Sequence, residues 1–412
     1  MADESEEKPS GHAYAGIRVL EFGQVLAAPY AAMMLADLGG DVIKVEPLGG
    51  DASRSYTPPD VGGESAYYLS VNRNKRGISL DLKSDAGRDA ALALVAKADV
   101  VIENSRAGVM DRLGLGYAAM KAINPGIIYC AISGYGRTGP FAERAGYDPI
   151  MQAESGLMSM SGERDGPPVR VGISVVDMVT GMFAAQAISA ALYARKESGE
   201  GQMIEANLFG SAANMLVNFG AQSLLTGDDP RRAGNGSQAA QPAGVYTSAD
   251  GEFMLTIGNE AMYQRFCARV LERPDLGTDP RFATNRDRVD HMAELTDVLN
   301  AVFGTRPNKV WLDRMLEHGI PAGEILGVRE ALASPMAQAV NLVGSAPHTT
   351  LGDLPTLMPS YSLSGTPVRD PVAAPLIGEH TRDVMREVAG WDEARIDAMI
   401  VAGQARAWED GA

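Results

Sequence analysis

Short apolar runs alternate with helical segments through the first part of the chain, and this rhythm most constrains the fold. Five of the runs are typical of buried strands: 17–22, 41–46, 78–82, 98–104 and 126–133. Helical segments separate them, one at 29–37 and another from a Ser84 cap to about Lys97. This alternation predicts an α/β fold with a mostly parallel sheet covered on both faces.

The chain changes character after about Gly220. Its 412 residues are long for one ordinary domain, so we expect two. A polar linker leads into a Gly/Ser/Gln loop at 233–242, and β-rich runs around Asp250-Gly251 then predict a hairpin. Charged helical segments at 261–318 indicate a smaller α+β unit, and a final helix is expected near 381–388.

Charge and cysteine content exclude several classes of protein. The formal net charge of −16 argues against a nucleic-acid or anionic-lipid surface. Cys130 and Cys267 lie far apart without a CxxC motif, which predicts buried free thiols and no metal site. The acidic N-terminus does not resemble a signal peptide, and the longest apolar run, 183–193, is too short to span a bilayer. We therefore expect a soluble, cytoplasmic protein.

Two glycine-containing stretches, 114–119 and 234–239, match a dinucleotide fingerprint by letters alone. Neither follows a predicted strand, as pyrophosphate binding requires, so a nicotinamide or flavin site is not expected. The chain has no P-loop, HExxH or GxSxG motif, and its five histidines are scattered. Carboxylates are therefore the best candidates for chemistry.

Asp177 lies between a strand-like run and a small-residue helix predicted at Met178–Arg195, which we expect to be buried on all sides. Ligands of open α/β sheets bind where a strand ends and a helix begins. The helix dipole and free amides at that point would keep the carboxylate ionised, as a nucleophile requires. Position alone also fits a simple helix N-cap, which contributes about 1 kcal/mol.

The motif Asp177-Met-Val-Thr180-Gly181-Met182 resembles that of the family III CoA-transferases (the CaiB/BaiF family, formyl-CoA transferase-like), in which a catalytic Asp precedes a small-residue helix containing TGM. Similar blocks follow in order along nearly the whole chain. They cover 16–47, 72–88, 99–117, 124–140, 198–208 and 377–381.

The resemblance implies a fold and partners. The large domain is expected to be Rossmann-like and built from both chain ends, with a smaller α+β domain inserted and an obligate, interlocked homodimer. The expected boundaries are a disordered lead at 1–14, a large domain at 15–225 and 335–412, and a small domain at 226–334. Coenzyme A and acyl-CoA are substrates, the other partner is a carboxylic acid, and no metal or permanently bound cofactor is expected.

The resemblance also implies a mechanism in which CoA moves from an acyl-CoA to a free acid. Asp177 would form an acyl anhydride and then an aspartyl-CoA thioester. Tyr147, Gln152 and Gln241 match other active-site positions. Gln241 ends the loop 233–242, which aligns with a glycine-rich loop that shields the intermediates, although Ala239 and Ala240 replace glycine there; a plain linker stays an alternative.

Contacts to CoA follow from the same matched blocks. Arg112 and Asn104 match positions near the nucleotide end, Lys75 and Arg76 match a loop near the phosphates, and Arg73 and Arg106 are further basic candidates. One departure is Leu48, where some transferases have Arg. The full predicted set is Gln24, Leu26, Ala27, Asn72, Lys75, Arg76, Asn104, Ser105, Arg112 and Leu113.

The main alternative is an α-methylacyl-CoA racemase, which shares this fold and uses a His with an Asp on opposite sides of the α-carbon. Tyr147 stands at the His position, and a phenol with a pKa near 10 is a poor proton abstractor, so transfer is favoured. A CoA-binding protein without activity is a third reading, which Asp177 argues against. Small dicarboxylates such as oxalate, succinate or an itaconate-like acid are candidate substrates, and Arg144 could hold a second carboxylate.

Overall fold

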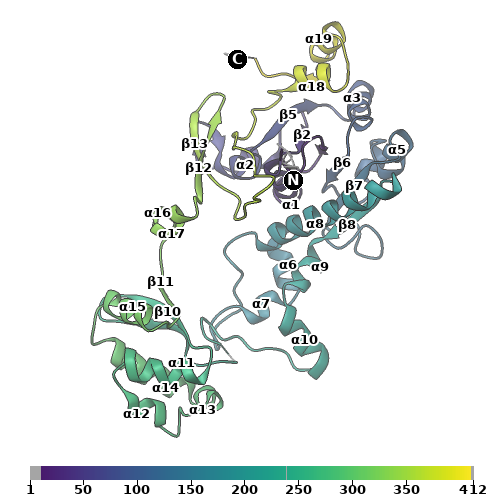
Figure 1. Ribbon diagram of the computed structural model, residues 1–412. Helices are drawn as coiled ribbons and strands as arrows, with labels where there is room; N and C mark the ends of the chain where they lie inside the picture. The colour runs from purple at the N-terminus through teal and green to yellow at the C-terminus, as the bar shows by residue number, and fades with distance from the viewer. Residues whose placement is uncertain (1–10, 238, 410–412) are drawn as a thin grey trace, which may run out of the picture. The chain divides into compact units, whose positions relative to one another are not determined.

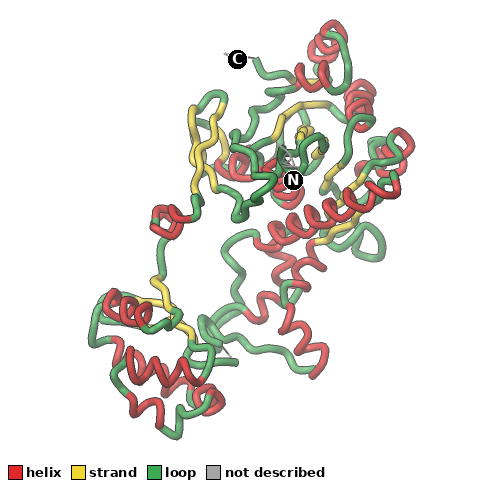
Figure 2. The backbone as a smooth tube through the Cα atoms, viewed as in Figure 1, coloured by secondary structure: helices red, strands yellow, loops and turns green. Residues whose placement is uncertain are grey.

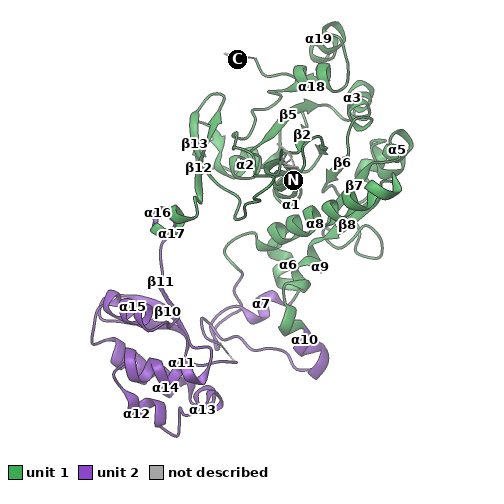
Figure 3. Ribbon diagram, in the orientation of Figure 1, with its two compact units in different colours: residues 1–155, 171–220, 335–412 green, residues 156–170, 221–334 purple. Residues whose placement is uncertain are grey.

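The computed structural model describes residues 11–237 and 239–409, and the chain divides into two compact units. Figure 3 shows both. The first unit comprises residues 1–155, 171–220 and 335–412, and the second comprises 156–170 and 221–334.

A seven-stranded sheet forms the centre of the first unit (Figure 1), in the order β14-β5-β2-β1-β6-β7-β8. All neighbouring strands are parallel except β14, which pairs antiparallel with β5. Apart from β14, the strands follow the order of the dinucleotide-binding folds, which reverses direction between β1 and β6. Their bounds are β1 Arg18–Glu21, β2 Asp41–Glu46, β5 Lys75–Leu80, β6 Val100–Glu103, β7 Ile128–Ser133, β8 Met203–Asn207 and β14 Ala405–Arg406.

Helices cover both faces of this sheet, so the predicted mixed α/β fold with a mostly parallel, two-sided sheet is confirmed. One apolar core lies under α3 (Asp85–Val95), α5 (Tyr117–Ile123), α18 (Thr381–Glu387) and α19 (Glu393–Val401). The other lies under α1 (Ala27–Asp37), α8 (Val175–Ser198) and α9 (Leu208–Asn214). Ser84 caps α3 as predicted, and Cys130 and Cys267 are buried free thiols.

Helix α8 is the long helix of the second core. It ends at Gly199, whose φ of +71° suits glycine. It packs on α1 through Gly181, where a side-chain carbon would lie 2.8 Å from the backbone oxygen of Ala27. The expectation of burial on every side is wrong, because Phe183 and Tyr193 are 41% and 72% exposed.

By length and composition alone, α8 could cross a membrane. The predicted apolar run at 183–193 covered only part of its 24 residues. Its buried side, which includes Val176, Ala184 and Ile188, belongs to the core beneath α1 and α9. A core helix of this kind satisfies the same criterion without a membrane.

Shorter elements complete the first unit. They are η1 (Ala52–Ser55), β3 (Asp60–Val61), β4 (Glu64–Ser65), α2 (Ala66–Val71), α4 (Val109–Arg112), α6 (Asp148–Glu154), α17 (Pro335–Ala339), β12 (Val343–His348) and β13 (Gly352–Leu357). Helix α10 (Val217–Thr226) lies at the boundary with the second unit. The predicted final helix at 381–388 is α18, but α19 and β14 follow it.

The second unit is mainly helical (Figure 2) around a three-stranded antiparallel sheet. The predicted hairpin at Asp250-Gly251 is confirmed as β9 and β10. Residues 156–170 belong to this second unit, although the prediction placed them in the large domain. Gly234 N donates to Gly162 O at 3.0 Å, which joins this segment to the rest of the unit. The elements are α7 (Leu157–Met160), β9 (Ala243–Thr247), β10 (Glu252–Thr256), α11 (Glu260–Arg265), η2 (Phe266–Val270), α12 (Pro274–Thr278), α13 (Asn285–Asp290), α14 (Met292–Phe303), α15 (Asn308–Glu317), β11 (Ala322–Glu324) and α16 (Val328–Ala333).

Candidate active site

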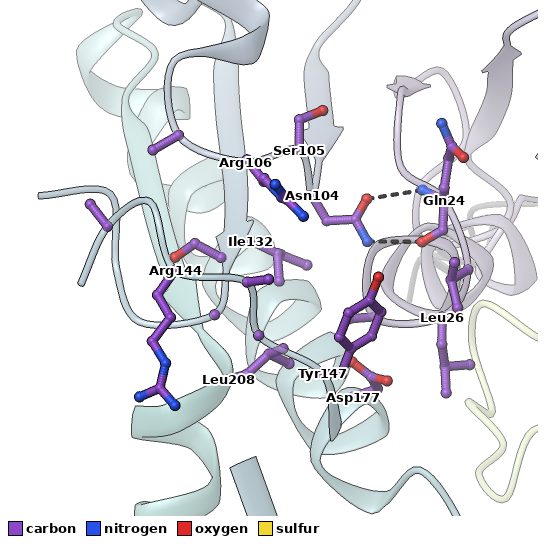
Figure 4. Close-up of a pocket in the computed structure, with 18 residues that line it drawn as sticks. Gln24, Leu26, Asn104, Ser105, Arg106, Ile132, Arg144, Tyr147, Asp177 and Leu208 are labelled. Carbon is purple, nitrogen blue, oxygen red and sulfur yellow. Dashed lines mark hydrogen bonds between the residues drawn. The ribbon is translucent and has the colours of Figure 1, made fainter. Parts of the chain in front are cut away.

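A pocket of about 240 Å³ lies where the strand order reverses, at the carboxyl ends of β1 and β6. Open α/β sheets bind ligands at this point, because the segments leaving the two strands diverge to opposite faces. All of the lining residues belong to the first unit (Figure 4). They are 24–27, 104–107, 132–134, Ala142, 144–147, Asp177 and Leu208.

The pocket brings together seven of the residues that the sequence predicted for the site: Gln24, Leu26, Ala27, Asn104, Ser105, Tyr147 and Asp177. Two of the lining segments, 24–27 and 104–107, are hydrogen-bonded to each other. The Asn104 amide accepts from Gln24 N at 2.9 Å and donates to Gln24 O at 2.8 Å (Figure 4). The loops after β1 and β6 therefore form one wall.

Asp177 is the third residue of α8, and the helix N-cap is Ser174. The carboxylate that caps this helix comes from another segment. Oδ2 of Asp148 accepts from Val176 N at 2.7 Å and from Asp177 N at 3.3 Å. The interpretation of Asp177 as the cap is therefore wrong, and its own carboxyl group is left to line the pocket.

Asp148 is the important residue that sequence reasoning missed. It is 3% exposed and begins α6 directly after Tyr147. Its Oδ1 accepts from Gln152 Nε2 at 2.6 Å, and Gln152 Oε1 accepts from Val171 N at 2.8 Å. Gln152 is fully buried and does not line the pocket, so the prediction that it is catalytic is corrected: it holds Asp148. The Asp-Pro pair at a helix start was the available signal.

The pKa of Asp177 is raised to about 7, first by burial and then by the charge of Asp148. This differs from the expectation that the helix start would keep Asp177 firmly ionised. The difference arises because Asp148 occupies the amides that would have stabilised the charge. A carboxylate that titrates near neutrality is more basic than an ordinary one and still ionises at working pH.

Tyr67 of α2 also faces this carboxyl group. Burial and the charge of Asp177 raise its pKa to about 12, while a hydrogen bond with Ser174 opposes the shift. Tyr67 therefore stays neutral at any physiological pH. The charged neighbour that raises the pKa of Asp177 is thus Asp148, while Asp177 in turn raises the pKa of Tyr67.

Lys75 and Asn72, both predicted to contact CoA, are buried and hydrogen-bonded within the protein. Lys75 is 3% exposed, and its three donors bind Glu21 Oε2, Pro29 O and Asn72 Oδ1, each at 2.8 Å. Asn72 is fully buried and donates to Tyr68 O. No donor of Lys75 is left for a phosphate, because both residues belong to a buried charge cluster beneath the sheet edge.

Three further predictions for the CoA site are also corrected. Arg76 forms an ion pair with Asp41 at 2.7 Å, and Arg73, a further basic candidate, pairs with buried Asp37. Leu113 packs against the apolar core. The motif letters could not show that these side chains make contacts within the protein.

Gln241 belongs to the second unit, where its side chain is fully engaged. Nε2 donates to Ser237 O at 2.8 Å, and Oε1 accepts from Ala243 N at 3.1 Å. It is 1% exposed, and Arg288 donates to its backbone oxygen. These contacts give Gln241 a structural role within the second unit, and its assignment to catalysis stays a prediction. Residue 238 of the loop 233–242 lies outside the described residues.

Two of the candidate arginines, Arg106 and Arg112, remain available to bind an anion. Arg106 lines the pocket and forms no ion pair with any described residue. Arg112 is exposed on α4, and its guanidinium would lie 3.1 Å from a side-chain carbon at Gly108. Arg144 lines the pocket, but its guanidinium is paired with Glu154 and lies 4.9 Å from the Tyr135 ring centre.

The site offers no metal ligands of the usual kind. Across residues 11–237 and 239–409, no group of three or more His, Cys, Asp and Glu side chains is placed to hold a metal ion. The chemical resources of the pocket are a carboxylate, backbone amides at a helix start, a phenol and arginine.

A parallel sheet with a carboxyl group in the pocket at its strand reversal is the arrangement of an α/β enzyme that binds a small ligand at this point. Residues 14–381 match CoA-transferase family III, and the chain belongs to this family. It is thus a CoA-transferase.

Two relatives and one solved structure illustrate the likeness. Succinyl-CoA:glutarate CoA-transferase of Mus musculus is 38% identical and covers 94% of this chain and 89% of its own. Succinate–glutarate CoA-transferase of Agrobacterium fabrum is 39% identical, covering 94% of this chain and 98% of its own. A CaiB/BaiF family protein from Brucella suis matches with a TM-score of 0.83 and 36% identity, covering 92% and 100% of the two chains.

Proposed function

We propose that this enzyme moves CoA from an acyl-CoA to a free carboxylic acid through covalent intermediates on Asp177. A carboxylate oxygen of Asp177 attacks the thioester carbon, and CoA leaves as the thiolate, giving a mixed anhydride. The thiolate then attacks the aspartyl carbonyl, releases the first acid and leaves an aspartyl-CoA thioester. The acceptor carboxylate displaces CoA to form a second anhydride, and CoA takes the new acyl group, which restores Asp177.

One observation carries this proposal: Asp177 is the carboxyl group that lines the pocket at the strand reversal. Burial and Asp148 raise its basicity, which strengthens it as a nucleophile. The wall of the pocket holds the reacting groups together, and proximity of that kind lowers the barrier to attack on a thioester. Tyr147 lines the same pocket and can donate its phenol proton to a bound carboxylate.

Dicarboxylic acids are the proposed substrates, with succinyl-CoA as the donor and glutarate as the acceptor. The relatives named for these acids support this choice. Arg106 pairs with no carboxylate among the described residues, so it is the candidate to bind an anionic part of the substrate, and the exposed Arg112 on α4 is the candidate for the CoA phosphates.

A trapping experiment tests the mechanism. Protein incubated with succinyl-CoA and then hydroxylamine is digested and analysed by mass spectrometry, with Asp177→Asn as the matched control. We expect an aspartyl hydroxamate on the peptide that contains Asp177 in the wild type and none in the variant. Exchange of the α-hydrogen in deuterated water without an adduct would instead favour a racemase and overturn the proposal.

The enzyme is proposed to act as a homodimer of interlocked chains. Large apolar side chains on α8 and α10 support this, since Tyr193 is 72% exposed and Val217 is 73% exposed. Such surfaces on a soluble protein usually cover an interface. Light scattering coupled to size exclusion should give the mass of two chains at micromolar concentration, and a stable monomer would contradict the proposal.

A further inference from the structure

Val25 lines the pocket in a conformation that such a residue rarely adopts. Its φ is +68°, in the left-handed region, although valine is β-branched. A residue stays in this region only when its surroundings hold it there, and strain of this kind gathers at functional sites. Val25 also sits immediately before the start of α1, so its conformation sets how that helix enters the pocket wall.

Side chains from three other segments bind the backbone around Val25. Val25 N donates to Asp51 Oδ1 at 3.1 Å, and Gly23 O accepts from Lys44 Nζ at 2.9 Å. The backbone N–H and C=O of Gln24 bind the Asn104 amide. Four backbone groups in three consecutive residues are thus fixed from inside the protein, which is more than an ordinary surface loop receives.

Asp51 is itself rigidly held. Its Oδ2 lies 2.8 Å from Lys44 Nζ, and its Oδ1 also accepts from Ser53 N at 2.8 Å. Lys44 in turn binds Glu21 Oε1 at 3.0 Å. Asp51 is 2% exposed and does not line the pocket, so it can act on the reaction only through the residues that it binds, which include Val25 and Lys44.

The turn at Val25 directs the start of α1 towards the pocket. Leu26 and Ala27 line it together with Asp177, and the first amides of a helix have no acceptor within the helix. Gly181, one turn after Asp177, packs against Ala27 O, which fixes the two helix starts together. Amides at such a position can stabilise the oxyanion of an acyl transfer.

We propose that Asp51 and Asn104 are positioning residues that hold Val25 in the left-handed conformation. The amides of Leu26 and Ala27 then face the oxyanion that forms when Asp177 attacks the thioester. This inference rests on the proposed function. In this inference the amides stabilise the transition state and do not bind the substrate. Their misplacement therefore lowers kcat more than it changes KM.

Two substitutions at Val25 test the requirement for a positive φ. Val25→Gly adopts positive φ without strain and should keep kcat within about threefold of the wild type. Val25→Pro fixes φ near −65° and removes the N–H that Asp51 accepts, so kcat should fall about 100-fold, the scale of a 1 Å misplacement. The KM for succinyl-CoA should change less than threefold. An active Val25→Pro enzyme would overturn the inference.

A double-mutant cycle tests Asp51. Asp51→Ala should lower kcat about 10- to 100-fold, and Val25→Gly in the same chain should recover most of the loss. Asp89→Ala, at an exposed position of α3, is the control that should change nothing. If Asp51 only neutralises Lys44, the glycine will not rescue activity, and the inference fails.

Circular dichroism and melting curves establish that each variant is folded. If either Val25→Pro or Asp51→Ala does not fold, the activity measured for the other variant decides whether the inference holds. Wild-type protein that forms no hydroxamate at Asp177 would refute the proposed function, whereas normal trapping with unchanged variant rates would refute only this inference.

Discussion

At the scale of single residues, the central feature is a pair of carboxyl groups with different tasks. Asp148 binds the first amides of α8 and is anchored by Gln152, while the carboxyl group of Asp177 lines the pocket and accepts no hydrogen bond from any residue that the structure describes. The pKa of Asp177 is raised to about 7 by burial and by Asp148. Two carboxylates in contrasting environments are the usual way to divide chemical roles at one pH.

We expect the pH dependence of kcat/KM to report Asp177. The rate should rise with pH through about 7, because only the ionised form attacks the thioester. Asp148→Asn removes the neighbouring charge and should move this limb to lower pH by about one unit. Asp165→Asn, on an exposed loop, is the control that should leave the limb in place. An acid limb near pH 4 in the wild type would contradict the pKa of Asp177.

The same shift predicts a change in stability. Because the pKa of Asp177 is higher in the folded protein than the ordinary 3.8, ionisation opposes folding as pH rises from about 4 to 7. At pH 8, Asp177→Asn should therefore unfold at a higher urea concentration than the wild type. Its free energy of unfolding should be larger by on the order of 2 kcal/mol. The difference should vanish below about pH 3, where the wild-type carboxyl is protonated in both states. An equal gain at both pH values would point to packing instead.

At the scale of elements, the contact between α1 and α8 positions Asp177. Both helices start at the pocket, and Gly181 allows their backbones to approach closely, since a side-chain carbon there would lie 2.8 Å from Ala27 O and 3.1 Å from the Tyr30 ring. The carbonyl belongs to the backbone and cannot move aside alone. The close packing of α1 against α8 therefore depends on the absence of a side chain at Gly181.

Gly181→Ala should destabilise the protein although alanine favours helices. The gain in helix propensity is at most about 1 kcal/mol, whereas overpacking costs about 1–3 kcal/mol. We expect a net loss of about 1–2 kcal/mol in urea unfolding, together with a lower kcat. Gly172→Ala is the matched control, because a side-chain carbon at Gly172 meets nothing within 4 Å. Unchanged stability in Gly181→Ala would show that α1 shifts freely.

The sequence predicts these elements unevenly, for physical reasons. Strand–helix alternation is local, so the parallel sheet and the Ser84 cap could be found from periodicity. The cap of α8 could not, since Asp148 and Val176 meet only when the chain has folded. Lys75 looks like a surface cation in sequence, but its partners come from β1, α1 and α2.

At the scale of the whole molecule, the two units have separate apolar cores. The core of the second unit is aromatic, with Phe253, Phe303 and Trp311 in edge-on contact at ring distances of 4.9 and 5.3 Å. The indole N–H of Trp311 donates to Phe303 O at 2.8 Å. An apolar core formed within one unit in this way is typical of a domain that can fold alone.

A fragment of residues 240–334 should therefore fold without the rest of the chain. We expect a cooperative thermal transition and a near-ultraviolet circular dichroism signal from Trp311. Phe303→Ala in the fragment removes about 3–5 kcal/mol and should abolish both signals. A fragment with neither signal would show that the aromatic core depends on the first unit.

The strand β14 has a practical consequence for handling the protein. It covers one edge of the main sheet, pairing Ala405 with Leu80 and Arg406 with Ser79. Exposed strand edges recruit strands of other molecules, and natural proteins conceal them. A recombinant chain trimmed before residue 405 would uncover β5 and invite self-association during expression. Tags and crystallisation truncations at this end should leave the last two-residue strand intact.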